Sequence, residues 1–406
     1  MESREDCKRR LQEKLTESID YSHENSDEEI QDLIDELLIR ESREMSLTLS
    51  DKTKLRRELF YAVRKLDILQ ELVDEPGITE IMINGPDYIF IEQAGRLYQS
   101  ELRFENEEKL HNVIQQIVSD CNRVVNDASP IVDARLYNGA RVNIVLNPVA
   151  INGPIVTIRK FPDKPITMEN LVSYGSVTPE VCDWLHKLVQ AKYNIFISGG
   201  TGSGKTTFLN ALSNYIPAEE RIITIEDSAE LQIRNIPNLV RMETRNANVE
   251  GCREITIRDL IKTSLRMRPD RIIVGEVRGG EAFDMMQCLN TGHDGSMSTG
   301  HANSCKDMLS RLENMILMGV EIPLAAIKQQ IASGIDIIVH LGRLRDKSRK
   351  VLEITEVIGY SDGEIMLKPL YQFAETGEDE KGRILGTLQK KGELTYVGKL
   401  QSAGLC

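Results

Sequence analysis

The stretch GGTGSGKTT, residues 199–207, decides the fold class of this chain of 406 residues. It follows the short apolar run NIFIS and precedes the run TTFLNALSNYI, which has a helical pattern. Glycines at such a turn let backbone N–H groups curl around phosphate oxygens, and the amino end of the following helix adds a favourable dipole. In this strand–turn–helix context the stretch predicts a phosphate-binding loop of the form G-x-x-x-x-G-K-[ST], with its fixed positions at Gly199, Gly204, Lys205 and Thr206.

The chemistry of such a loop assigns roles to its side chains. We expect the Lys205 ammonium to reach the β- and γ-phosphates of a nucleotide, and the Thr206 hydroxyl to coordinate Mg²⁺. ATP and Mg²⁺ are therefore the expected cofactors. The loop residues predicted to bind the nucleotide are Gly199, Gly200, Thr201, Gly202, Ser203, Gly204, Lys205, Thr206 and Thr207.

Acidic residues follow two further apolar runs. RIITIEDSAEL places Glu226 and Asp227 at the end of a predicted strand, with Glu230 just beyond, and RPDRIIVGEVRG places Glu276 after another. In an open parallel sheet, ligands bind at the carboxyl ends of the strands. An acid there holds Mg²⁺ through water or orients an attacking water, and a glutamate suits general-base work. We therefore predict catalytic roles for these four acids, with Glu276 also near the metal.

Two of the six histidines lie in TGHDGSMSTGHANS, residues 291–304. SMST has the pattern of a strand, which would put His301 at a carboxyl end near the same phosphates. An imidazole there can hydrogen-bond a γ-phosphate and register its loss. His293 is a second candidate, although a simple turn histidine is the alternative at that position. A metal site would need more ligands than this segment supplies.

The chain divides into four predicted parts. Residues 1–65 form a helical region, which is either a small bundle packed on the rest or an arm that docks a partner. Residues 66–160 form a small α+β domain, and 161–168, with two prolines, form a linker. In 169–406 predicted strands alternate with helices, which indicates a parallel sheet covered by helices and an α/β fold.

Composition limits the function classes. The net charge of −13 argues against a general nucleic-acid binder, although a local basic patch stays open. The sequence contains no apolar run of about 18 residues, so we expect no transmembrane span. The start of the chain is highly charged and lacks an apolar segment, so we expect no secretory signal. Seven scattered cysteines predict reduced thiols in the cytoplasm, without a disulfide framework or a structural zinc.

The order of these motifs resembles the type II/type IV secretion ATPase superfamily. The phosphate loop, TIEDSAEL, MRPDRIIVGEVRGGEAFDMMQ and TGHDGSMSTGHANS correspond to its Walker A, Asp box, Walker B and His box. Other segments are similar to the CpaF/TadA branch, the tight-adherence pilus ATPases. They are ITEIMINGPDYIFIEQAGRL, DARLYNGARVNIVLNPVAINGPIVTIRKF, METRNANVEG and FAETGEDEKGRILG.

The resemblance implies a hexameric cytoplasmic ATPase at the inner face of the membrane, with a RecA-like P-loop motor domain behind a PAS-like α+β domain. It implies a motor for type IV pilus assembly of the Flp type or for protein secretion, with an inner-membrane platform protein as partner and no direct nucleic acid. It also implies that His301 senses the γ-phosphate. Arginines of the N-terminal domain that reach the nucleotide correspond to Arg135, Arg141 and Arg159.

Two features depart from the family pattern, and three rival functions stay open. LDILQELV, residues 66–73, stands where a GPLEPLL-like stretch is common, and the tetracysteine zinc module of type II secretion ATPases is missing. One rival is a RecA-like motor that acts on DNA. A second is a conjugation-type ATPase of the same superfamily, and a third is a nucleotide-gated scaffold without hydrolysis.

Overall fold

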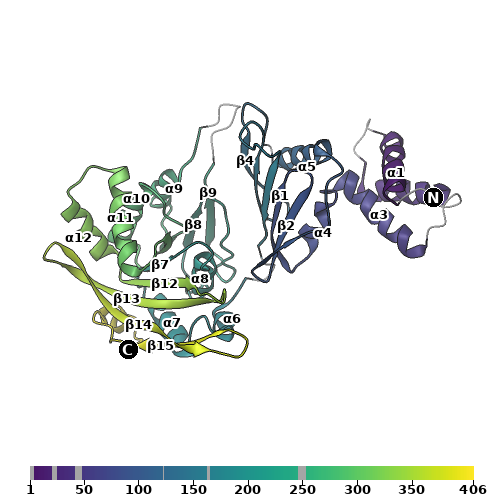
Figure 1. Ribbon diagram of the computed structural model, residues 1–406. Coiled ribbons are helices and arrows are strands. Elements are labelled where there is room, and N and C mark those ends of the chain that lie inside the picture. Colours follow the sequence, from purple (N-terminus) through teal and green to yellow (C-terminus); the bar gives the residue numbers. More distant parts are fainter. Residues whose placement is uncertain (1–3, 21–24, 42–47, 122, 162–164, 246–252) are drawn as a thin grey trace. The chain divides into compact units, whose positions relative to one another are not determined.

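The structure is a computed structural model in which residues 4–20, 25–41, 48–121, 123–161, 165–245 and 253–406 are described. The chain divides into two compact units, Met1–Pro162 and Asp163–Cys406 (Figure 1). The boundary falls inside the predicted linker, of which 162–164 lie outside the described residues. No helix in the described ranges is long and apolar enough to span a bilayer.

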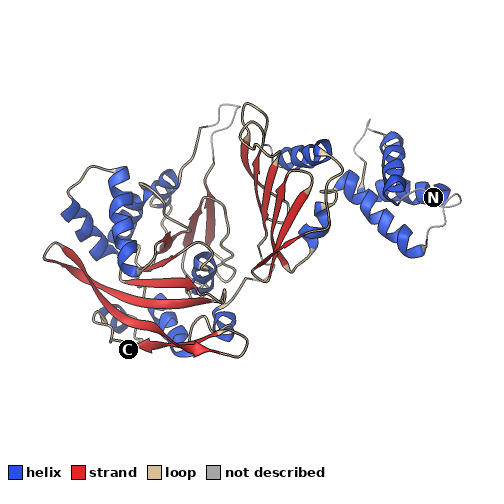
Figure 2. Cartoon of the chain, in the orientation of Figure 1, coloured by secondary structure: helices blue, strands red, loops and turns tan. Residues whose placement is uncertain are grey.

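Three amphipathic helices open the first unit (Figure 2): α1 (Arg4–Ser18), α2 (Asp27–Glu41) and α3 (Leu49–Arg64). A capping box closes the start of α2, because the Ser26 hydroxyl accepts the Glu29 N–H and the Glu29 carboxylate accepts the Ser26 N–H. The three helices bury one shared apolar core, so they form a small bundle. Its most buried members include Leu11, Leu15, Ile30, Ile34, Leu55 and Leu59.

The predicted α+β region forms a six-stranded antiparallel sheet with strand order β3-β2-β1-β6-β5-β4. Its tight turns have positive φ at Gly85, Ala94, Gly95 and Gly139. Alternate residues face a core shared with two helices, while the other residues form the opposite face. The elements are α4 (Leu69–Asp74), β1 (Ile78–Asn84), β2 (Tyr88–Gln93), β3 (Arg96–Gln99), α5 (Glu107–Asp120), β4 (Ile131–Arg135), β5 (Arg141–Val145) and β6 (Ile155–Arg159).

The second unit contains a nine-stranded sheet with strand order β15-β14-β13-β12-β7-β11-β10-β8-β9. The six strands from β12 to β9 are parallel, which confirms the predicted alternation of strands and helices. These strands are β7 (Ile195–Gly199), β8 (Ile222–Glu226), β9 (Leu239–Glu243), β10 (Arg271–Val274), β11 (Met297–His301) and β12 (Ile337–Arg343).

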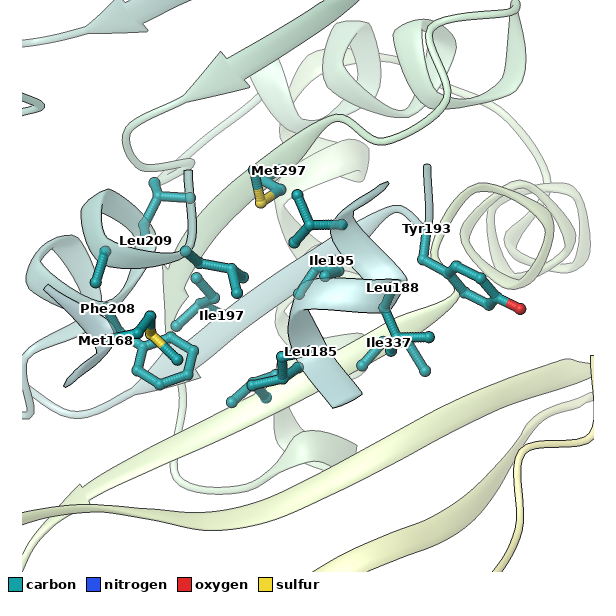
Figure 3. Close-up of a cluster of buried hydrophobic side chains, with 14 of the residues drawn as sticks. Met168, Leu185, Leu188, Tyr193, Ile195, Ile197, Phe208, Leu209, Met297 and Ile337 are labelled. Atoms are coloured by element: carbon teal, nitrogen blue, oxygen red, sulfur yellow. The ribbon is translucent and has the colours of Figure 1, made fainter. Parts of the chain in front are cut away.

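Helices bury both faces of the central parallel strands, and β7, β8 and β10 are buried along their whole length. In β7, Ile195 and Ile197 pack in one core (Figure 3), while Phe196 between them packs in the other. The first core is shared with α6 (Met168–Ser173), α7 (Pro179–Gln190) and α8 (Lys205–Ser213). The second is shared with α9 (Ile257–Ser264), α10 (Glu281–Asn290), α11 (Cys305–Gly319) and α12 (Leu324–Gly334).

An antiparallel extension completes this sheet beyond β12. It consists of β13 (Arg349–Ser361), β14 (Glu364–Glu378) and β15 (Ile384–Lys390), none of which the sequence predicted as strands. The chain then returns to the sheet through α13 (Gly398–Ser402). The buried Glu356 carboxylate accepts the N–H groups of Thr395 and Tyr396, and Lys399 forms ion pairs with Asp294 and Asp336.

A buried ion pair anchors the amino end of β10. Arg271 is 0% exposed and binds both carboxylate oxygens of Glu220, at 2.6 and 2.7 Å. Its Nη1 also donates to the carbonyl of Val189, near the end of α7, and to that of Gly295, just before β11. Removing one partner of such a pair leaves the other charge buried and poorly compensated.

Arg271→Met should therefore lower the free energy of unfolding of the second unit by about 3–5 kcal/mol. Urea titration followed by the fluorescence of Trp184 measures this, because the chain has one tryptophan and its ring lies 5.4 Å from that of Tyr371 in the same unit. Lys390→Met, which removes the exposed pair with Glu393, is the control and should leave the midpoint almost unchanged. Equal midpoints for the two variants would contradict a structural role for the buried pair.

Candidate functional site

The predicted phosphate loop joins β7 to α8, as its sequence context requires. Its backbone has positive φ at Gly199 (156°), Gly202 (71°) and Gly204 (93°), a region that favours glycine. Gly199 also approaches β12 so closely that a Cβ atom there would collide with the Leu341 carbonyl oxygen. The glycines of the motif are therefore required by the loop's conformation and packing.

Lys205 is the first residue of α8 and is only 7% exposed. Its Nζ donates to the carbonyl oxygen of Gly200 at 3.2 Å and lies 3.2 Å from Nδ1 of His301. Ser203 is also buried, and its Oγ has no hydrogen-bond partner among the described residues. The loop thus holds a buried ammonium and an unsatisfied hydroxyl, both suited to phosphate oxygens.

The sheet brings His301 and Glu276 next to this loop. His301 is the last residue of β11 and pairs with Gly199 of β7, which confirms that it ends a strand. Glu276 follows β10, the neighbour of β11 on its other side. His301 Nε2 lies 2.8 Å from Glu276 Oε1. Lys205, His301 and Glu276 form a row of contacts across three neighbouring strand ends, here called the contact chain.

The contact chain indicates which nitrogen of His301 carries the proton. The Lys205 ammonium only donates, so Nδ1 acts as an acceptor and the proton of a neutral ring sits on Nε2, facing Glu276. Burial lowers the pKa of His301, the Glu276 carboxylate opposes that shift, and the Lys205 charge adds to it. A neutral imidazole between a cation and an anion is the result at neutral pH.

Arg278 belongs to the same group of side chains, and sequence reasoning missed it. Its Nη2 donates to Glu276 Oε2 at 2.8 Å, and its Nη1 lies 3.4 Å from Asp227 Oδ2, beyond the end of β8. The hydrogen bond to Glu276 raises the pKa of Arg278. The sequence signal that could have identified Arg278 is a basic residue two positions after the predicted catalytic Glu276.

The acids predicted after β8 have different surroundings. Glu226 is 3% exposed, and its Oε1 accepts the backbone N–H groups of Glu230 and Leu231, each at 2.9 Å. Burial raises the pKa of Glu226 to about 7. Asp227 is exposed and approaches Arg278, while Glu230 is half-buried. Glu226 therefore shapes the loop after β8, whereas Asp227 is the acid that joins Arg278 and Glu276.

His293 lies away from the contact chain within its unit. It sits in the turn before β11, where its carbonyl oxygen accepts the Ser296 hydroxyl at 2.7 Å. A strand of five residues, at about 3.3 Å per residue, separates this turn from His301. The two imidazoles lie at opposite ends of one strand, and a catalytic role for His293 stays a prediction. The turn alternative fits the placement of His293.

The three predicted arginines form a row on the sheet of the first unit. Arg135, Arg141 and Arg159 are direct cross-strand partners on β4, β5 and β6. The neighbouring positions on these strands face the core, so the row lies on the opposite sheet face. Arg141 is 3.5 Å from an Asp133 oxygen, and Arg159 is 3.7 Å from one of Glu80.

The described residues contain no preformed metal cluster, and they include only part of the METRNANVEG segment. Across the ranges that the structure describes, no three His, Cys, Asp or Glu side chains gather in a group that could hold a metal ion. METRNANVEG begins within β9, and its Arg245 forms a β-bridge with Ile255. Its residues 246–251 lie outside the described residues.

Residues 63–382 match the family described as type II/IV secretion system protein. A Mycobacterium tuberculosis protein named "Putative conjugal transfer protein" is 35% identical over 327 residues, which cover 79% of this chain and 92% of that one. The type IV secretion system protein VirB11 of Brucella suis is 32% identical over 303 residues, which cover 68% of this chain and 84% of that relative.

The solved structures agree on the fold. The Yersinia pseudotuberculosis ATPase DotB superimposes with a TM-score of 0.52 at 18% identity, covering 73% of this chain and 79% of that one. The predicted α/β class with a RecA-like motor fold and a helical N-terminal region is confirmed. With a family match of this extent and relatives above 30% identity, the chain belongs to the type II/IV secretion system protein family.

Proposed function

We propose that this chain is a Mg²⁺-dependent ATPase, a hydrolase that converts ATP and water to ADP and phosphate. The observation that carries the proposal is the contact chain, in which the phosphate-loop lysine reaches a strand-end glutamate through His301. Lys205, which is suited to binding phosphates, contacts His301, and His301 in turn contacts Glu276, whose carboxylate is suited to activating water. The named relatives VirB11 and DotB, a secretion protein and an ATPase, support the same class of activity.

The loop supplies the groups that a triphosphate needs. The backbone N–H groups of the glycine-rich turn and the Ser203 hydroxyl accommodate oxygens, and Lys205 contributes its charge to the β- and γ-phosphates. Mg²⁺, when bound, neutralises phosphate charge and orients the phosphate oxygens. Thr206 would hold it directly and Glu276 through water, because Mg²⁺ usually keeps several of its waters.

Glu276 is the proposed general base for the attacking water. Its two carboxylate oxygens contact His301 and Arg278, which fix the orientation of the group. His301 is the proposed sensor of the γ-phosphate, since its neutral ring stands between Lys205 and the base. Asp227 holds Arg278 from the next strand, and Glu226 and Glu230 keep the intervening loop in place.

The arginine row is proposed to complete the site when the two units close, either within one chain or from a neighbouring copy. A guanidinium at a transferring phosphoryl group stabilises the charge that develops there. Hydrolysis would then depend on closure, and this dependence would convert chemistry into motion. Such a mechanism suits a homo-oligomer, for which we propose the hexamer that the family resemblance implies.

The proposed cellular role is that of a cytoplasmic motor at the inner face of the membrane. It would act on an inner-membrane platform protein to drive assembly of a tight-adherence (Flp-type) type IV pilus or protein secretion. The similarity of several segments to the CpaF/TadA branch supports the pilus assignment. The relative named for conjugal transfer favours the alternative, a conjugation-type or DNA-transfer ATPase. The net charge of −13 weighs against direct contact with DNA.

Lys205→Ala should abolish ATP binding and Mg²⁺-dependent turnover, because the buried ammonium is needed on the phosphates. Titration calorimetry with ATP and a phosphate-release assay with and without EDTA measure the two effects. Lys187→Ala, which changes an exposed lysine of α7, is the control and should match the wild type. Turnover by Lys205→Ala at the wild-type rate would refute the phosphate-loop assignment. A wild-type chain that binds ATP without hydrolysing it would support the scaffold alternative.

Arg141→Ala and Arg159→Ala in the full chain should each lower kcat on the order of 10³-fold. Both side chains lie on the exposed sheet face, so melting temperatures should stay close to that of the wild type. Arg96→Ala, on the edge strand β3, is a matched control from the same sheet and should keep full activity. Wild-type kcat in both row variants would show that the row has no catalytic part.

A further inference from the structure

Two arginines of the hairpin that joins β12 to β13 lie against the phosphate loop. β12 ends at Arg343, β13 begins at Arg349, and the two residues are direct partners across the hairpin. β12 is the neighbour of β7 on the side away from β11, and its Leu341 pairs with Gly199. The hairpin therefore flanks the phosphate loop on the side opposite the contact chain.

Arg343 and Arg349 both lie close to the glycines of the phosphate loop. Arg349 Nε donates to the carbonyl oxygen of Gly202 at 2.8 Å, and its Cδ is 3.4 Å from where a Cβ of Gly204 would stand. Arg343 Nη1 lies 3.7 Å from the corresponding position at Gly202. Larger residues at either glycine would thus lie directly against the two arginine side chains.

The charge of Arg349 is not compensated within the part of the chain that the structure describes. No carboxylate there forms an ion pair with its guanidinium, whose hydrogen bond goes to a backbone carbonyl. Arg345, in the turn of the same hairpin, is in contrast paired with Glu375 and Glu378. An unpaired guanidinium that retains free N–H donors beside an anion-binding loop is suited to a phosphate oxygen.

The position of the contact chain indicates which phosphate Arg349 would contact. A γ-phosphate presented to Glu276 and His301 points toward β11 and β10, so the nucleoside end of the molecule extends toward β12. We propose that Arg349, with Arg343 beside it, is a further nucleotide-binding residue that contacts the β-phosphate. This inference rests on the proposed ATPase function and adds a group that acts on ATP and ADP alike.

The proposal predicts an effect on affinity with little effect on catalysis. Arg349→Gln should weaken binding of ADP, of a non-hydrolysable ATP analogue and of inorganic pyrophosphate by about tenfold each. The turnover number at saturating ATP should stay within about twofold of wild type, because the lost contact is the same in ground and transition states. Calorimetry with the three ligands and steady-state kinetics measure these quantities in the full chain.

Matched variants separate charge from loop shape. Glutamine still offers an N–H to the Gly202 carbonyl but carries no charge, whereas Arg349→Lys keeps both the charge and a donor and should recover most of the affinity. Arg345→Gln removes a carboxylate-paired arginine of the same hairpin and should bind as wild type. Should Arg349→Gln unfold at lower temperature, Arg349→Lys still tests whether charge at this position sets the affinity.

Several results would overturn the inference. Wild-type affinity of Arg349→Gln for ADP, alongside lost binding in Lys205→Ala, would sink the inference and leave the proposed function intact. Weakened ADP binding with unchanged pyrophosphate binding would place the contact on the nucleotide beyond the β-phosphate and contradict the assignment. A loss confined to turnover at saturating ATP would make Arg349 catalytic instead. If the wild-type chain binds no nucleotide, the proposed function itself fails.

Discussion

The contact chain of Lys205, His301 and Glu276 is the interaction on which the rest of the account depends. It exists because three parallel strands, β7, β11 and β10, end side by side, with His301 opposite Gly199. A one-residue slip of β11 would turn His301 to the other face of the sheet. Strand order, register and the glycine-rich turn are therefore all needed to bring a lysine, an imidazole and a carboxylate within contact distance.

Local patterns in the sequence predicted the elements that build this site. The runs before Gly199, Asp227 and Glu276 are rich in apolar residues because helices bury both faces of their strands. SMST indicated the strand that ends at His301, and GGTGSGKTT indicated the turn between β7 and α8. Each signal lies within a few neighbouring residues, so it can be read without knowing the tertiary structure.

Other features depend on contacts between distant segments, and the sequence did not predict them. Bulges after Ile354, Val357 and Glu375 interrupt the alternation of β13 and β14, which hides these strands from a period-two pattern. The roles inferred for Arg278 and Arg349 depend on the residues that the fold places beside them, Glu276 and Gly202 respectively. The burial of Glu226, and the turn that separates His293 from His301, likewise follow from the sheet rather than from motif spacing.

The account's central claim is that Glu276, held in the contact chain, activates water at a bound ATP. The most direct test is Glu276→Gln, measured for both ATP affinity and the rate of a single turnover with Mg²⁺. The amide preserves the size of the side chain but removes the base, so affinity should stay near the wild-type value while the rate falls by ~10²–10⁴-fold. Hydrolysis by this variant at the wild-type rate would contradict the claim.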